Sequence, residues 1–220
     1  DLIIRGGDSL RTYKGILCVV DVATRRAWTE VLKSTTSASV SKAMQSVLER
    51  SEKEGRNFRV MHTDNGAEFK GAFRDLMEKF NVRQVYGVAH RSTGQAIVER
   101  FNQTLQLGME KEISTSEDGV KWHALVAKHT KMYNDKPNRN LRMKKEGEEN
   151  YTMYTPNQLW ESDKALLAQL YEGKKSELGQ AHKRYDTEED VKLGDVVRVV
   201  DMAKRKNALA KGFRPNWSKE

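Results

Sequence analysis

Residues 58–69 read FRVMHTDNGAEF and contain the strongest signal in the chain. Phe58 to His62 has the character of a short strand, and Asp64 follows in a turn with Asn65 and Gly66. A carboxylate just beyond the C-terminal end of a parallel strand lies where α/β sheets form their sites. This stretch therefore predicts a strand with a functional acidic residue just beyond its C-terminal end.

Strand and helix patterns continue on both sides of this stretch. Strands are expected at residues 1–4, 16–22, 28–32 and 82–86, with 23–26 as a hairpin turn. Apolar residues at helical spacing predict helices at about 37–53, 69–80, 95–113 and 122–133. Three strands followed by alternating helices and strands predict a mixed sheet covered by helices.

The long helix that begins near Gln95 has two distinct faces. An apolar stripe, expected to pack on the core, is formed by Ile97, Phe101, Leu105, Met109 and Ile113. A polar face collects Gln95, Glu99, Asn102 and Gln106. On the helix alone, a solvated polar surface is the favoured explanation of this second face, ahead of a functional site.

The last third of the chain is more polar. Residues 135–150 are expected to form a loop or linker, and Thr155-Pro156 opens a short helix. Residues 162–185 have helical propensity and the character of a connector, and a strand-like pattern begins at Val191. Residues 202–219 then carry basic side chains, with Phe213 and Trp217 between them and no acid within this range.

Composition restricts the function classes. The formal charge of +8 and the pI of about 9.4 favour nucleic acid or an acidic surface as partner. The single cysteine, Cys18, lies in an apolar run, is expected to be a buried thiol and excludes a disulfide within the chain. No stretch approaches the roughly 18 apolar residues of a membrane span.

Several motifs together resemble the catalytic core of retroviral-type integrases. HTDNGAEF (62–69) is similar to the segment around that family's second Asp, and IVERFNQTL (97–105) to its Glu helix, with 34 residues between the two acids. DL (1–2), GILCVVDVATRRAW (15–28), KMYND (131–135) and YTPNQLW (154–160) resemble further landmarks. Within the family the chain looks most like integrases of Maverick/Polinton transposons, with retrotransposon integrases as an alternative.

The resemblance implies an α/β fold in two domains. A ribonuclease H-like core, a mixed five-stranded sheet flanked by helices, is expected over residues 1–160. A helical connector is expected at 161–190, and a partial, all-β SH3-like DNA-binding barrel at 191–220.

The resemblance also implies an Asp-Asp-Glu triad formed by Asp1, Asp64 and Glu99. These residues are expected to be both catalytic and metal-binding, with Asp21 as the alternative first acid. Three carboxylates suit two Mg²⁺ ions, with Mn²⁺ as a substitute, because hard cations prefer oxygen ligands. Two such ions about 3.5–4 Å apart stabilise both ends of an in-line displacement at phosphorus. The implied reactions are 3′-end processing of element DNA and strand transfer into target DNA.

Other side chains are expected to contact DNA. In the core these are Arg91, Gln95, Arg100 and Asn102, and in the C-terminal run Lys204, Arg205, Lys206, Lys211 and Arg214. Asn65 is expected to support Asp64 through a turn hydrogen bond. For the residues near the acids a solvent-facing or capping role explains the sequence equally well.

The implied partners are element ends and target DNA, with no membrane and with a homodimer or higher oligomer because two DNA ends must be joined. The expected location is the nucleus of a eukaryotic host, or an association with the virus or element. Two alternatives from other classes are a domesticated, non-catalytic DNA-binding scaffold and a ribonuclease H-like nuclease.

Overall fold

A computed structural model describes residues 1–4, 12–87, 96–116, 120–144 and 150–172. The chain divides into one compact unit, residues 1–171, and a second unit, residues 172–220. The second unit lies almost wholly outside the described residues, and so does the SH3-like barrel expected at 191–220. Within the described residues no helix is long and apolar enough to cross a membrane.

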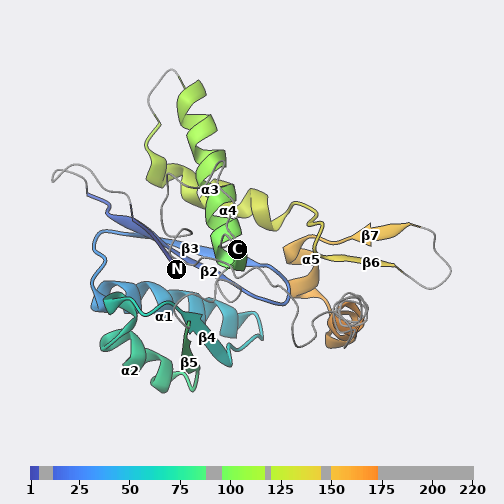
Figure 1. Cartoon of the computed structure of the whole chain (residues 1–220), viewed down its shortest axis with the longest axis horizontal. Coiled ribbons are helices and arrows are strands. Elements are labelled where there is room, and N and C mark those ends of the chain that lie inside the picture. The colour runs from blue at the N-terminus through green and yellow to red at the C-terminus, as the bar shows by residue number, and fades with distance from the viewer. Residues whose placement is uncertain (5–11, 88–95, 117–119, 145–149, 173–220) are drawn as a thin grey trace, which may run out of the picture. The chain divides into compact units, whose positions relative to one another are not determined.

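The first sheet is antiparallel and contains, in spatial order, β1 (Leu2–Ile4), β2 (Gly15–Val20) and β3 (Ala27–Leu32) (Figure 1). β1 covers only the beginning of β2, with Leu2 opposite Leu17. Asp1 continues this ladder, because the Cys18 N–H donates to the Asp1 carbonyl at 2.9 Å and the Asp1 amino group donates to the Cys18 carbonyl at 3.1 Å. Asp1 is thereby fixed in line with the sheet.

The pleat of β2 divides the interior into two cores. Leu17 and Val19 belong to one buried cluster, and Ile16 and Cys18 belong to another, as expected when successive side chains point to opposite faces. The first cluster is completed by α1 (Ser37–Lys53) and α2 (Ala72–Lys79). The second is completed by α3 (Ala96–Thr115) and α4 (Trp122–Asn134). Figure 1 shows the sheet with α1 on one side and α3 and α4 on the other.

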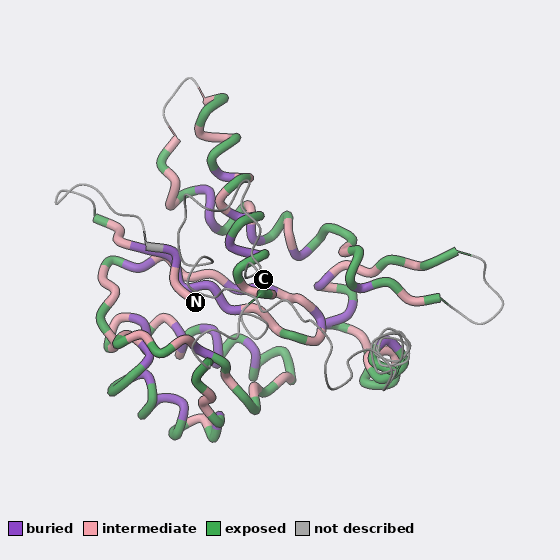
Figure 2. Tube along the Cα trace, viewed as in Figure 1, coloured by how far each residue is buried: buried purple, intermediate pink, exposed green. Residues whose placement is uncertain are grey.

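The helix predictions are confirmed where they rested on a stripe of apolar residues. α1 has the predicted bounds, 37–53, and it buries the predicted Val40, Met44, Val47 and Leu48. In α3 the predicted stripe buries Phe101, Leu105 and Met109. Figure 2 shows these helices with one buried side and one exposed side, the pattern that a surface helix has when it covers a sheet.

A second, two-stranded sheet pairs β4 (Val60–Thr63) with β5 (Arg83–Tyr86) in parallel. The described strands therefore do not form the single five-stranded sheet that was expected. β1 is only three residues long and pairs with Gly15 to Leu17, so no ladder connects it to β4. The core is still mixed α/β, with antiparallel strands first and a parallel pair after α1.

The expected loop at 135–150 is wrong in part, because it contains a strand. β6 (Arg142–Lys144) pairs with β7 (Tyr151–Met153) as an antiparallel hairpin separate from the other sheets. A small third core, with Leu141, Leu159 and Leu170 at its centre, lies at the base of the hairpin. Leu170 lies in a helical stretch that begins at residue 164, so part of the expected connector packs within the first compact unit.

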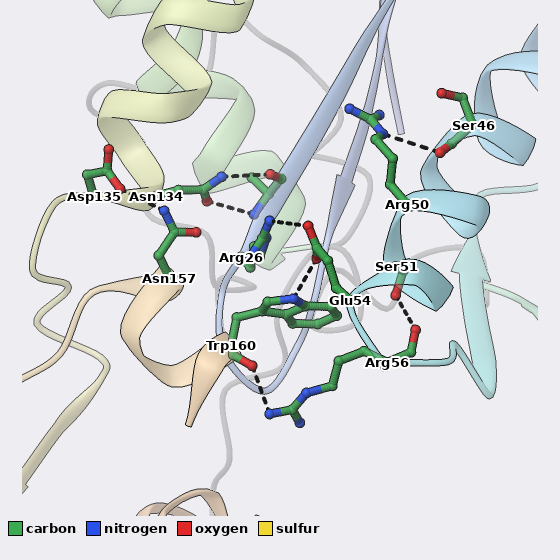
Figure 3. A network of polar contacts seen from close by, with 11 residues as sticks. Arg26, Ser46, Arg50, Ser51, Glu54, Arg56, Asn134, Asp135, Asn157 and Trp160 are labelled. Carbon is green, nitrogen blue, oxygen red and sulfur yellow. Dashed lines mark hydrogen bonds and ion pairs between the residues drawn. The ribbon is translucent and has the colours of Figure 1, made fainter. Parts of the chain in front are cut away.

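A polar network joins the short helix α5 (Pro156–Glu161) to the first core (Figure 3). α5 begins with a capping box in which Thr155 and Gln158 exchange hydrogen bonds. Trp160, at its end, packs edge-on against Trp28 with ring centroids 4.9 Å apart, and its indole N–H donates to Glu54 Oε2 at 2.7 Å. Arg56 donates to the carbonyls of Trp160 and Ser162 at 2.8 and 2.7 Å. This network fixes the polypeptide that follows the hairpin onto α1 and β3.

Candidate functional site

Asp1 is the acidic residue that the fold holds most firmly. The Leu2 N–H donates to Asp1 Oδ1 at 2.8 Å, and the Asn102 side-chain amide donates to Asp1 Oδ2 at 2.8 Å. Both carboxylate oxygens are therefore hydrogen-bonded, and the main chain is fixed by Cys18. Hydrogen bonds from N–H groups favour the ionised form of a carboxylate, so this arrangement presents a negative charge in a fixed position.

Asn102 connects Asp1 to the helix that carries Glu99. The side chain of Asn102 is only 8% exposed, and it lies in α3 three residues after Glu99. Residues three apart on a helix are neighbours on one face. The hydrogen bond from Asn102 to Asp1 therefore brings the first turns of α3, with the exposed Glu99, to the end of β1.

Asp64 follows β4 in a tight turn. Its Oδ1 accepts a hydrogen bond from the Gly66 N–H at 3.1 Å. The short 3-10 helix η1 (Ala67–Phe69) comes next and carries Glu68 back toward the turn. A Cβ at Gly66 would lie 2.5 Å from Glu68 Oε2, so this position requires glycine while Glu68 keeps its place. The Asp64 and Glu68 side chains thus flank the same glycine.

The charges of this turn also reach Asp1. Burial lowers the pKa of the Asp1 amino group, while the Cys18 thiol and the carboxylates of Asp64 and Glu68 act in the opposite direction. Asp64 and Glu68 therefore contribute to the electrostatic environment of Asp1. Sequence reasoning identified Asp64 and missed Glu68, although Glu68 belongs to the same TDNGAEF segment.

Cys18 is the buried thiol that the sequence predicted, at 1% exposure. Burial raises its pKa to about 12. A thiol with so high a pKa carries almost no thiolate at neutral pH, so Cys18 contributes packing to the second core and no nucleophile.

A cleft of about 340 Å³ lies beside Asp1, between the two sheets. Its walls are largely apolar and come from β2, β4 and the beginning of α3, including Leu17, Val60, Ile97 and Val98. Asp1 and Thr63 supply polar groups to it. Asp64 directly follows Thr63 and Glu99 directly follows Val98, so each of these two acids adjoins a residue that lines the cleft.

Asp21, the alternative first acid, has a structural role. Its Oδ2 accepts hydrogen bonds from the Thr24 N–H at 2.7 Å and the Thr24 hydroxyl at 2.8 Å. These bonds form the turn between β2 and β3, in which Arg25 adopts a positive φ of 62°. Side chains of Asp commonly stabilise turns in this way. Asp21 lines the cleft, but its carboxylate is engaged in holding the hairpin.

The structure describes only some of the predicted DNA contacts. Arg100 is exposed on α3, and Asn102 is buried against Asp1. Asn65 is exposed, and the turn hydrogen bond at Asp64 comes from Gly66. Outside the described residues lie Arg91, Gln95, Lys204, Arg205, Lys206, Lys211 and Arg214.

The donor chemistry suits a divalent cation, although the described residues do not gather a complete metal centre. Among them no group of three or more His, Cys, Asp or Glu side chains is arranged to hold a metal ion. Asn102, which donates to Asp1, has a buried Oδ1 with no hydrogen-bond partner within the described part of the chain. An unsatisfied oxygen beside carboxylates is the kind of atom that a hydrated hard cation satisfies.

Comparison with family models finds no match, and comparison with curated proteins finds none either. Solved structures do match. A chain of the simian T-cell lymphotropic virus intasome, solved by cryo-EM in complex with PP2A regulatory subunit B56 gamma, is 21% identical with a TM-score of 0.53. The match covers 69% of this chain and 49% of that one, so this chain spans about half the length of its neighbour.

A second match is the HTLV-2 integrase catalytic core domain in complex with magnesium, in a trimeric form. It is 16% identical with a TM-score of 0.47, over 61% of this chain and 82% of that one. At these identities the likeness concerns the fold. The intasome match shows that the described unit has the fold of a retroviral-type integrase core, as the motifs predicted.

Proposed function

We propose that this chain is the core of a DNA integrase or transposase, which performs metal-dependent 3′-end processing and then strand transfer of element DNA into target DNA. The observation that carries this proposal is the hydrogen bond from Asn102 to Asp1, which joins the helix of Glu99 to the strand end of Asp1. Asp64 contributes to the electrostatic environment of Asp1. The integrase-like fold supports the same conclusion.

In this proposal Asp1, Asp64 and Glu99 hold two Mg²⁺ ions, with Mn²⁺ able to substitute. When bound, such ions stabilise negative charge on the attacking and leaving oxygens of a phosphodiester. The protein holds the carboxylates in position. Asn102 and the Leu2 N–H orient the Asp1 carboxylate, and the Gly66 N–H orients the Asp64 carboxylate. Arg91, Gln95 and Arg100 and the basic residues between 204 and 214 would bind DNA phosphates.

Partners and location follow from the reaction. Joining two DNA ends to one target requires two active sites near each other, so we infer a homodimer or larger assembly on DNA. The working location would be the nucleus of a eukaryotic host, or a particle of the virus or element.

A non-catalytic DNA-binding scaffold is the second candidate. The observation in its favour is that the described residues show no group of three metal-binding side chains. A ribonuclease H-like nuclease would use the same acids but would release cleaved strands instead of joining them.

Metal dependence separates these candidates. We expect the protein to resolve a branched DNA substrate, the reverse of strand transfer, in Mg²⁺ or Mn²⁺, and excess chelator to abolish the reaction because carboxylates alone cannot stabilise the phosphorane charge. Sequencing-gel analysis of a labelled strand distinguishes joined from merely cleaved product. Cleavage without joining would favour the nuclease, and salt-sensitive DNA binding without either product would favour the scaffold.

A further inference from the structure

The β6–β7 hairpin has a base anchored in the protein. Asn138 donates to the Tyr154 carbonyl at 3.0 Å, and Tyr154 donates to the Leu141 carbonyl at 2.9 Å. Leu141 is fully buried in the third core, and Met143 and Tyr154 pack against that core. An isolated two-stranded hairpin is only marginally stable in water, so these contacts at its base are what hold it in one orientation.

The other side of the hairpin faces solvent. The side chains of Met143 and Thr152, which are paired across the strands, are half-buried, while their neighbours along each strand are exposed. This alternation gives the hairpin an outer face, formed by Arg142, Lys144, Tyr151 and Met153. Figure 2 shows both strands with exposed and partly buried residues.

The chemistry of the outer face is basic and aromatic. Arg142 and Lys144 make no ion pair with any described residue, and the Arg142 guanidinium carbon lies 4.8 Å from the centroid of the Tyr151 ring. Tyr151 and Met153 are 48% and 53% exposed. Nearby, Lys136 and Arg139 are exposed as well. Residues 145–149, which include three glutamates, lie outside the described residues.

The geometry points to this outer face as a DNA-binding surface separate from the acidic site, with Arg142 and Lys144 on phosphates and Tyr151 stacked on an exposed base. Exposed cations next to an aromatic ring form the usual combination for binding a nucleic acid strand. The inference deepens the proposed function and rests on it, since DNA is the substrate proposed there. It adds a contact that neither the acids nor the C-terminal basic run provides.

The test is DNA binding by the full chain, measured by fluorescence anisotropy with a labelled 20-nucleotide single strand and the matching duplex. The double variant Arg142→Gln/Lys144→Gln should bind both DNAs on the order of tenfold more weakly at low salt. It should also reduce the magnitude of the slope of log affinity against log salt, by about 1.8 for the duplex (two phosphate contacts at about 0.9 each) and by about 1.4 for the single strand (about 0.7 each). A matched control, Lys42→Gln/Lys53→Gln, removes the same charge from exposed positions of α1 and should leave the slope unchanged.

Tyr151→Ala should weaken single-strand binding by about fivefold or more, with a smaller effect on the duplex. Wild-type affinity and salt slope in Arg142→Gln/Lys144→Gln, with the fold intact by circular dichroism, would overturn the inference. An equal response of single strand and duplex to Tyr151→Ala would overturn the stacking role. Both experiments measure DNA binding and not DNA joining. If wild type binds DNA but does not join it, and the hairpin variant binds more weakly, only the proposed function is refuted and the hairpin surface stands.

Discussion

Asp1→Asn is expected to lower the rate of DNA joining by on the order of a thousandfold, because metal stabilisation of transition-state charge is worth several kcal/mol. Asn keeps the size of the side chain and can still accept from the Leu2 N–H, so the fold should be retained. The rate is measured on a branched DNA substrate at saturating Mg²⁺, with the unfolding midpoint as a control for stability.

Asp21→Asn is the matched comparison, because it removes the same charge from the other candidate for the first acid. Its amide oxygen can still accept from Thr24 and preserve the turn between β2 and β3. We expect the joining rate to stay within a few-fold of wild type. The opposite pattern, with Asp21→Asn inactive and Asp1→Asn active, would transfer the first catalytic position to Asp21.

Trp160→Ala is expected to destabilise the protein by about 3–5 kcal/mol, the usual cost of removing a large buried aromatic side chain. Trp160 is 7% exposed and contacts Trp28, Glu54 and Arg26. Its loss leaves a cavity in the first core and removes the indole partner of Glu54. The free energy of unfolding from urea denaturation, analysed with an unchanged m-value, gives the loss directly.

Trp160→Phe separates packing from hydrogen bonding at the same position. Phe retains an aromatic ring against Trp28 but cannot donate to Glu54, so a loss of about 1 kcal/mol is expected. If Trp160→Ala lowered the free energy of unfolding by less than about 1 kcal/mol, the network of Figure 3 would be unimportant for stability.

Periodicity was sufficient to predict the elements that bury a continuous stripe. The stripe of α3 and the four buried positions of α1 were predictable, because an apolar residue every three or four positions has few alternatives to a helix against a core. The β6–β7 hairpin was missed for the complementary reason. Each of its strands has three residues, and β6 contains one apolar residue between two charged ones, which gives no pattern to detect.

Sequence motifs could identify residues of the candidate site, but they could not predict how these residues are arranged in space. TDNG and the Glu helix indicated Asp64 and Glu99, whereas the bond from Asn102 to Asp1 joins positions 101 residues apart and depends on how α3 lies on the sheet. Glu68 comes near Gly66 because η1 folds back toward the turn, a local geometry that the side-chain type of Glu68 does not reveal. β1 and β4 form no ladder among the described strands. Pairing of this kind depends on strand length, which residue patterns define poorly.

Strand transfer by wild type and by Glu99→Gln tests the central claim most directly. The substrate is a labelled duplex with the element's terminal sequence and a recessed 3′-hydroxyl end, the target is a supercoiled plasmid, and Mg²⁺ is present. Glu99 is exposed, so its replacement should leave stability unchanged. We expect labelled plasmid from wild type and none from Glu99→Gln at equal DNA occupancy. Equal joining by the two proteins would show that Glu99 takes no part in catalysis.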